Sequence, residues 1–279
     1  MKWNKKSTPH LKKQCDLNAE VILPLQENHS PYDVFTAVTN LDQLLQIIVD
    51  ESNRYAQQKG REFQTNVEEM RAFLGINFIM TINKLPTIKS YWQCNQFLGN
   101  EGIRSVISRT RFEEILRNLH FADNNQYDKN DKAYKVRSII SHFNDSFAAS
   151  VSDDASESVD EHMVKFKGRS SMKQYVKNKP IKWGFKFWYR CASKTGFLYE
   201  FDLYLGKKES KEECLGPSVV LSLTQGLQNT NCTVFFDNFF NSVSLITKLF
   251  DNGIYGVGTA RMDRKGMPKE LKAGQMKDK

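Results

Sequence analysis

The chain contains 279 residues, of which 40% are hydrophobic and 12% are aromatic. This length favours one large domain or two smaller ones, and the apolar content is enough to bury a sizeable core. The aromatic content excludes a chain that is disordered throughout. The longest mostly apolar run, Ala72 to Ile82, is too short to cross a bilayer, and the charged N-terminus lacks the apolar stretch of a secretion signal.

The formal net charge of +8 comes from one segment of the sequence. Residues 163–190 contain nine Lys and Arg and no Asp or Glu, whereas the rest of the chain has 31 basic and 32 acidic residues. Such a run favours an anionic partner, and nucleic acid is the usual one because phosphate binding releases counterions. A solvated basic surface is the alternative interpretation.

The cysteines and histidines do not predict a metal centre. The chain has five of each, without a CxxC pair, an HxxxH pair or a mixed cluster. A structural zinc site is therefore not expected. Scattered cysteines without a signal peptide favour reduced thiols in the cytosol or the nucleus.

The first half of the chain is expected to be helical. Residues 1–30 are basic and polar and predict a weakly ordered tail, and residues 31–150 carry apolar side chains at helical spacing. The clearest helices are expected at residues 41–55, 65–78, 109–119 and 138–147. Thr65 followed by Glu68 matches a capping box at the start of the second of these helices.

After a short acidic linker at residues 152–158, the pattern changes to strands. Residues 151–279 predict the order β-β-β-α-β-α-β, with a hairpin loop at residues 194–196 that places Gly196 at a positive φ. The strands are expected in the sequences SVDEHMVKFK, KWGFKFWYRCAS, FLYEFDLYLGK, CTVFFDN and YGVGTAR, and the helices at residues 217–227 and 245–250. Three strands followed by alternation predict a mixed sheet with helices on its faces, and the fold class is therefore mixed α+β.

Two aspartates stand where such a sheet could carry chemistry. Asp160 lies on the first predicted strand, and Asp237 ends the buried apolar strand VFFD, 77 residues later. If these strands are neighbours, the two carboxylates converge, and paired hard oxygen ligands suit Mg²⁺ or Mn²⁺. In the alternative interpretation, Asp237 begins a turn and Asp160 is a surface residue.

Several long motifs, in order, resemble the piggyBac transposable-element-derived transposases. In the second half these are SVDEHMVKFKGRSSMKQYVKNKPIKWGFKFW, SKTG with YLGK, VFFDNFFNS and YGVGTARMDRKGMP. In the first half they are EEMRAFLGINFIMTINKLPTIKSYW and SRTRFEEILRNLHFADN. The resemblance runs from about Tyr32 to Pro268.

The resemblance implies a helical dimerisation and DNA-binding domain at residues 31–150 and an RNase H-like catalytic core from residue 151. It implies that Asp160 (in VDEHM) and Asp237 (in FFDNFF) are the first two members of a catalytic aspartate triad that holds two Mg²⁺ or Mn²⁺ ions. The activity would be metal-dependent cleavage and strand transfer of double-stranded DNA in the nucleus, through a hairpin on the element and attack at TTAA. A homodimer is expected, and neither a membrane nor a small-molecule substrate is.

The DNA path is expected along the basic segment. The candidate phosphate contacts are Lys165, Lys167, Arg169, Lys173, Lys177, Lys179, Lys182, Arg261 and Lys265. Arg261 and Lys265 could equally belong to a solvated loop. Trp183, Phe185 and Trp188 are expected in the core rather than against bases. His162 could share the strand face of Asp160, but a packed or exposed histidine is the favoured interpretation.

The family's third aspartate, in a GGVD-type element, and its cysteine-rich C-terminal module are not found before Lys279. We therefore expect a C-terminally truncated core with impaired catalysis. A non-enzymatic, domesticated DNA-binding or regulatory protein is the alternative. A decayed reading frame, which would give a poorly soluble product, is a third hypothesis.

Overall fold

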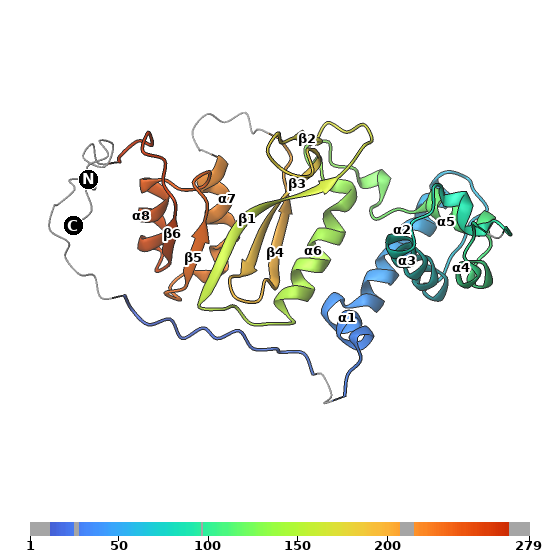
Figure 1. The fold of residues 1–279 in the computed structure, drawn as a ribbon, viewed down its shortest axis with the longest axis horizontal. Helices are drawn as coiled ribbons and strands as arrows, with labels where there is room; N and C mark the ends of the chain where they lie inside the picture. The colour runs from blue at the N-terminus through green and yellow to red at the C-terminus, as the bar shows by residue number, and fades with distance from the viewer. Residues whose placement is uncertain (1–11, 25–27, 96, 207–214, 268–279) are drawn as a thin grey trace. The chain divides into compact units, whose positions relative to one another are not determined.

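The computed structural model describes residues 12–24, 28–95, 97–206 and 215–267 as a mixed α/β fold (Figure 1). The chain forms two compact units, one from Leu25 to His142 and the other from Met1–Pro24 together with Phe143–Lys279. We call them the helical unit and the sheet unit. The expected mixed fold with a mixed sheet is confirmed. No helix among the described residues combines the length and apolar character of a membrane span.

The regular elements described in the helical unit are helices. The α-helices are α1 (Pro31–Thr39), α2 (Leu41–Gln58), α3 (Val67–Ile82), α4 (Glu101–Val106) and α5 (Arg109–Asn118), and α6 (Tyr134–Ala148) begins here and continues into the sheet unit. Short 3₁₀ turns lie at Ile88–Trp92 and Asn124–Gln126. Helix α2 buries the predicted stripe that includes Leu45 and Ile48, since these residues recur on one helical face.

Helix α3 begins one residue later than the capping pattern predicted. The N-cap is Asn66, whose Oδ1 accepts a hydrogen bond from the backbone N of Glu69 at 2.8 Å. Thr65 instead donates its hydroxyl to the Glu69 carboxylate at 2.6 Å. Asn is as good an N-cap residue as Thr, because its side-chain oxygen also accepts a hydrogen bond from the free N3 amide. The helix can therefore start after Asn66 rather than after Thr65.

The described residues of the sheet unit form six strands. They are β1 (Ser156–Lys165), β2 (Gln174–Tyr175), β3 (Trp183–Ala192), β4 (Leu198–Leu203), β5 (Thr233–Phe236) and β6 (Tyr255–Gly258). The order is β2-β3-β1-β5-β6, and β4 pairs with β3. The pairs of β3 with β1, β2 and β4 are antiparallel, whereas β1, β5 and β6 run parallel. Five strands were expected, and the two-residue strand β2 was not.

Both faces of the sheet are covered. Helices α7 (Leu215–Leu223) and α8 (Val243–Asp251) close over a buried cluster that includes Trp188, Val220 and Leu245. On the opposite face, Phe147 of α6 lies 6.4 Å from Phe201 of β4 between ring centroids. Gly196 adopts the expected positive φ, 75°, in the β3–β4 hairpin. The apolar run of β5 is thus explained by its place inside the sheet.

Residues 12–24 lie along the sheet unit, although the sequence predicted a weakly ordered tail over residues 1–30. The Lys12 amine donates to Thr233 Oγ1 at 2.7 Å, and the Lys13 backbone N donates to the Tyr255 hydroxyl at 2.9 Å. Val21 forms an isolated antiparallel bridge with Val151. The rest of the predicted tail includes residues 1–11 and 25–27, which lie outside the described residues.

Candidate functional site

Asp160 lies on β1, and Asp237 directly follows β5, the parallel neighbour of β1. The β1–β5 register pairs Val159 with Phe236, so that the next residue on each chain is an aspartate. Neighbouring strands are about 4.8 Å apart, and residues in register point to the same face. Val159 and Phe236 are buried, whereas both aspartates are exposed. The condition for convergence, that the two strands are neighbours, is therefore met.

The Asp237 carboxylate also shapes the turn that follows β5. Its Oδ1 accepts a hydrogen bond from the backbone N of Phe239 at 2.7 Å. Arg264 donates from Nη2 to the carbonyl oxygens of Asn238 at 3.1 Å and Phe239 at 3.0 Å. Arg261 donates from Nε to Asn238 Oδ1 at 3.2 Å. The segment after β6 thus fixes the backbone immediately after Asp237.

Two half-buried lysine amines have pKa values that respond to nearby carboxylates. Lys179 lies 3.1 Å from Glu161 Oε1, and Lys186 lies 4.1 Å above the ring of Trp188. Burial by itself would lower the pKa of Lys179, but the ion pair with Glu161 and the carboxylates of Asp160 and Asp237 raise it. Burial lowers the pKa of Lys186, and the same carboxylates oppose this effect.

Most of the basic segment is exposed. Lys165, Lys167, Arg169, Lys177 and Lys182 are exposed, as are Arg261 and Lys265 in the segment after β6. Lys173 and Lys179 have partners within the chain, since Lys173 donates to the carbonyl of Gly168 at 2.8 Å and Lys179 pairs with Glu161. Trp183 was expected in the core, but 53% of its surface is exposed. It is the first residue of β3, and its ring contacts Tyr175 of the two-residue edge strand β2 and the amine of Lys173, which leave about half of its surface exposed.

Arg190, the last cation of the basic segment, does not face solvent. Its Nη1 lies 2.8 Å from both Glu157 Oε2 and Asp153 Oδ1, and 8% of the residue is exposed. Burial raises the pKa of Glu157 to about 7, because the loss of water outweighs the attraction of Arg190. Two of the nine basic residues, Lys179 and Arg190, are therefore neutralised by carboxylates that lie outside the segment.

Comparison with known proteins decides the family. A family model described as Transposase IS4, of the DDE type, matches residues 30–279. The human PiggyBac transposable element-derived protein 3 is 35% identical over 229 residues, and the human protein 2 of the same series is 31% identical over 277 residues. The chain belongs to the piggyBac-type transposase family.

The fold agrees with this piggyBac assignment. The cryo-EM structure of a piggyBac transposase synaptic complex with hairpin DNA superposes with a TM-score of 0.78 at 25% sequence identity, over 90% of this chain and 55% of that one. The alignments with the two human relatives cover 80% and 95% of this chain, but 38% and 45% of the relatives. The chain thus spans less than half the length of the curated piggyBac relatives that it matches.

The donor set of this piggyBac-type chain fits a divalent ion in part. Across the described ranges, no group of three or more His, Cys, Asp or Glu side chains is close enough to hold a metal. Asp160 and Asp237 supply two exposed carboxylates, each one residue beyond the last pair in the β1–β5 register. Mg²⁺ is commonly held by one or two carboxylates together with water and phosphate oxygens, so that this pair is a suitable donor set.

Sequence reasoning did not single out three further residues near the sheet end that carries Asp237. Glu161 follows Asp160 on β1 and therefore points to the opposite face of the sheet, and its pairing with Lys179 depends on the path of the chain between β2 and β3. Lys186 is one of nine cations in the basic segment, and only the structure shows that its amine contacts the ring of Trp188. Arg264 was passed over for Lys265, although an Arg three positions after Arg261 offers the same reach.

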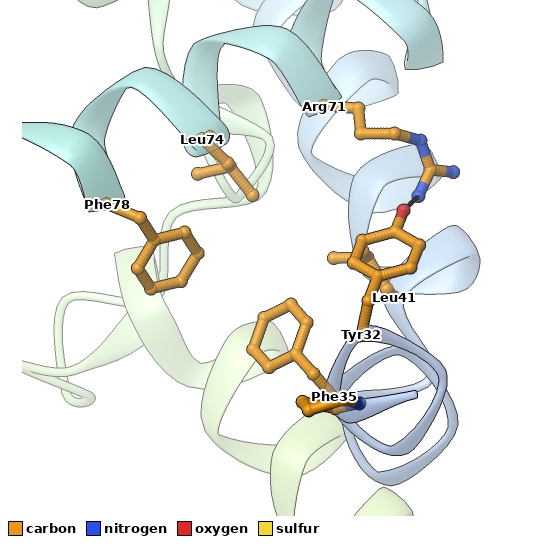
Figure 2. A pocket seen from close by; sticks show the side chains of 8 residues that line it. Tyr32, Phe35, Leu41, Arg71, Leu74 and Phe78 are labelled. Atoms are coloured by element: carbon orange, nitrogen blue, oxygen red, sulfur yellow. Dashed lines mark hydrogen bonds between the residues drawn. The ribbon is translucent and has the colours of Figure 1, made fainter. Parts of the chain in front are cut away.

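A separate apolar cavity lies in the helical unit, between α1 and α3 (Figure 2). It has a volume of about 400 Å³ and is lined by Pro31, Tyr32, Phe35, Leu41, Arg71, Leu74, Gly75 and Phe78. The rings of Phe35 and Phe78 meet edge to face, with centroids 5.6 Å apart. Arg71 closes one side through a hydrogen bond to the Tyr32 hydroxyl at 3.0 Å and an ion pair with Asp42.

Proposed function

We propose that this chain is a DNA-binding protein of piggyBac transposase descent, and that its sheet unit carries the remnant of a metal-dependent DNA cleavage and strand-transfer site. The observation that supports the proposal most directly is the register of β1 and β5, which sets Asp160 beside Asp237. The exposed cations of the basic segment provide the positive charge that a phosphodiester requires. The nucleus is the compartment where such a protein would meet its DNA.

In this proposal the sheet unit is an RNase H-like core, and the helical unit contributes to dimerisation and DNA binding. Asp160 and Asp237 would hold Mg²⁺ or Mn²⁺ through their exposed carboxylates. When bound, such ions promote attack of a hydroxyl or water on phosphorus and stabilise the leaving oxygen. The turn braced by Arg264 would keep the Asp237 carboxylate in place while DNA binds.

The basic segment would neutralise the DNA backbone. Its exposed members are separate point charges on the loops and strand ends that flank β2, an arrangement suited to phosphate contacts rather than to base reading. Arg261 and Lys265 would extend this surface along the segment after β6. Since Trp183 is exposed beside Lys173, at 5.3 Å from its amine, it is the aromatic side chain best placed to contact DNA.

We further infer that the chain by itself cleaves DNA only at trace rates, because two carboxylates bind a divalent ion more weakly than three do. The experiment incubates the 279-residue protein with Mn²⁺ and hairpin-ended duplex DNA. We expect trace cleavage, and we expect Asp237→Asn to abolish it, because the amide is a poor ligand for a hard cation. Asp251→Asn, the same change at an exposed aspartate of α8, serves as the control that should leave the trace activity intact.

Strong turnover that survives Asp237→Asn would overturn the role proposed for this aspartate. Isothermal titration with Mn²⁺ gives an independent readout, since the wild-type protein should bind the ion and Asp237→Asn should bind it at least roughly tenfold more weakly. Equal Mn²⁺ affinity of the two proteins would show that the ion does not bind at this site.

A non-enzymatic DNA-binding or regulatory role is the second candidate, and it is favoured by the exposure of Lys165, Lys167 and Arg169. Reversing these three charges to Glu should weaken DNA binding and flatten its salt dependence, because each lost phosphate contact removes about one unit of slope. If binding persists in wild-type protein without divalent ions and cleavage never occurs, this second role holds. An unchanged affinity and slope would exclude the basic segment as the DNA surface.

A further inference from the structure

One face of the sheet carries a row of aromatic side chains along β3. Alternate residues of a strand point to the same face, and every second residue of β3 from its start is aromatic as far as Tyr189. We call Trp183, Phe185, Phe187 and Tyr189 the aromatic row. The ring centroids of Phe187 and Tyr189 lie 6.3 Å apart, in agreement with a shared face. The row extends over about 20 Å of strand.

The aromatic row lies on the face of the sheet to which Asp160 points. In the β1–β3 pairing, Asp160 stands opposite Tyr189, and His162 stands opposite Phe187. Residues that pair across two strands point to the same side of a sheet. The ring of His162 stacks on that of Tyr189, with centroids 5.0 Å apart and an angle of 11° between the planes, which confirms the shared face. A DNA strand with a phosphate at Asp160 can therefore continue over the aromatic row.

The end of the aromatic row at Trp183 is open to solvent. Trp183 pairs with Tyr175 of β2, and the centroids of the two rings lie 4.7 Å apart. Trp183 is 53% exposed, Tyr175 is 52% exposed and Val164 is 43% exposed. Farther along the row, the ring of Phe201 from β4 lies 6.0 Å from that of Phe187 and covers part of it. The open end therefore offers aromatic surface that another molecule can cover.

The segments that border this open end are basic. The Lys173 amine lies 5.3 Å from the ring centroid of Trp183, and residues 163–190 contain no Asp or Glu. The exposed cations of these segments are Lys165, Lys167, Arg169, Lys177 and Lys182. Aromatic rings bordered by cations suit a ligand that combines flat apolar groups with an anionic backbone. Single-stranded nucleic acid has both, whereas a duplex keeps the faces of its bases stacked inside.

We propose that the aromatic row is a stacking site for unpaired bases of DNA, with Trp183 and Tyr175 as its main contacts. The ligand is a single-stranded DNA segment whose bases lie on the rings while its phosphates lie against the exposed cations. Stacking does not depend on the identity of the base, because every base has a π face. This inference rests on the proposed function and deepens it, since it assigns a substrate with unpaired bases to the face of Asp160.

Fluorescence anisotropy without divalent ions tests the proposal with two labelled duplexes, one blunt and one with a single-stranded extension of about eight thymidines. We expect the 279-residue protein to prefer the extended duplex. Trp183→Ala should bind the extended duplex roughly tenfold more weakly and the blunt duplex equally well, and Trp183→Phe should recover most of the loss because it keeps a ring. Phe250→Ala, at a side chain of α8 that is also 53% exposed, is the matched control and should retain the preference.

Two further measurements separate stacking from phosphate binding. Trp183→Ala should leave the salt dependence of binding unchanged, because the ring carries no charge, whereas Lys173→Gln should lower the salt slope by about 1. A base stacked on an indole also quenches its fluorescence. Oligothymidine should therefore quench the tryptophan emission of wild type more than that of Trp183→Phe, and equal quenching of the two proteins would contradict the proposal.

The failures of the two proposals are distinguishable. If the wild-type protein binds neither duplex, the proposed function fails and the stacking site fails with it. If it binds both duplexes equally and Trp183→Ala behaves like Phe250→Ala, the stacking site is wrong while the DNA-binding function stands. Loss of self-association in Trp183→Ala with unchanged DNA affinity would assign the aromatic row to a protein contact instead. Thermal melts establish that each variant is folded, and Tyr175→Ala keeps the test available if Trp183→Ala is not.

Discussion

At the scale of single residues, the sheet unit keeps a charged cluster in its interior. Glu157 is fully buried, and it shares the guanidinium of Arg190 with Asp153. Burial by itself would lower the pKa of Arg190, yet the adjacent Glu157 and Asp153 carboxylates raise it above its ordinary value. The Oε1 atom of Glu157 is buried without a hydrogen-bond partner among the described residues, so that the cluster is not fully satisfied.

Glu157 makes the stability of the sheet unit depend on pH. Its pKa is about 7 in the folded protein, against an ordinary value of 4.5, so that the folded state holds the proton more tightly than the unfolded chain does. The stabilising contribution is complete below pH 4.5 and is lost as the pH rises through about 7. We expect Glu157→Gln to remove this loss and to gain up to roughly 3 kcal/mol relative to wild type between pH 4.5 and 8.

Urea unfolding at several pH values measures this effect as the free-energy difference between variant and wild type. Glu62→Gln changes an exposed carboxylate in the helical unit and should give a difference that does not vary with pH. A flat profile for Glu157→Gln as well would mean that Glu157 is ionised in the fold throughout this range and that Arg190 stabilises its charge fully.

At the scale of elements, helix α3 is apolar on more than one side. Met70, Phe73 and Ile76 are buried in the helical core, whereas Phe78 and Ile82 are 53% and 87% exposed. This explains why periodicity located the helix but could not say which face is buried. The buried face of α2 was predictable, because that helix has one apolar face and one polar face.

Gly75 lies in the middle of α3, beside the cavity of Figure 2, and replacing it should stabilise the helix. A Cβ built on Gly75 meets no atom within 4 Å, so that alanine fits without strain. Because glycine lowers helix stability relative to alanine, we expect Gly75→Ala to raise the free energy of unfolding by about 0.5–1 kcal/mol. Differential scanning calorimetry should show a higher Tm.

The matched control is Gly184→Ala in β3. Its Cβ would lie 2.0 Å from the carbonyl oxygen of Val164, a contact with backbone that cannot move away cheaply. We expect this variant to be destabilised, which separates the open glycine from the crowded one. A Gly75→Ala protein that melts below wild type would indicate that the helix bends at this position in solution.

The elements also show how far sequence reasoning reaches. Strong patterns located α2, α5, β1, β3, β4 and β5, and the neighbouring positions of β1 and β5 follow from a conditional prediction about Asp160 and Asp237. The two-residue strand β2 and the six-residue helix α4 were missed, because segments of this length carry too few residues for a period. Helix α1 was not singled out either, and of its nine residues only Thr39 is buried, so that it has no buried apolar stripe. The proximity of Asp160 and Asp237 could be predicted from the sequence. The contacts of Lys179 with Glu161 and of Lys186 with Trp188 could not, because they depend on the tertiary path of the chain.

At the scale of the whole molecule, each unit contains a cysteine whose reactivity can be used to follow its unfolding, and the two cysteines differ in exposure. Cys94 is exposed in the helical unit, and Cys232 is fully buried in the core of the sheet unit, where burial raises the pKa of its thiol. Since thiolates are the reactive form, we expect iodoacetamide to label Cys94 rapidly and Cys232 only when the sheet unit unfolds. Peptide mass spectrometry after timed labelling measures both rates.

Labelling in increasing urea extends this prediction to the folding of each unit. The rate at Cys232 should rise with the unfolding transition, and full labelling in guanidinium chloride provides the upper reference. Fast native labelling of Cys232 would contradict the closed core described around β5. Cys94→Ser should leave the Cys232 profile unchanged, because the two cysteines belong to different units.

The segment at residues 12–24 means that the beginning of the chain serves a distant part of the sequence. Its partners, Thr233, Tyr255 and Val151, all belong to the sheet unit. A protease cut or a downstream translation start that removed these residues would therefore leave the helices that come next in the sequence unaltered. It would remove Cys15 and Leu17, which pack against the buried cluster of the sheet unit. The unit that carries Asp160 and Asp237 would therefore lose stability.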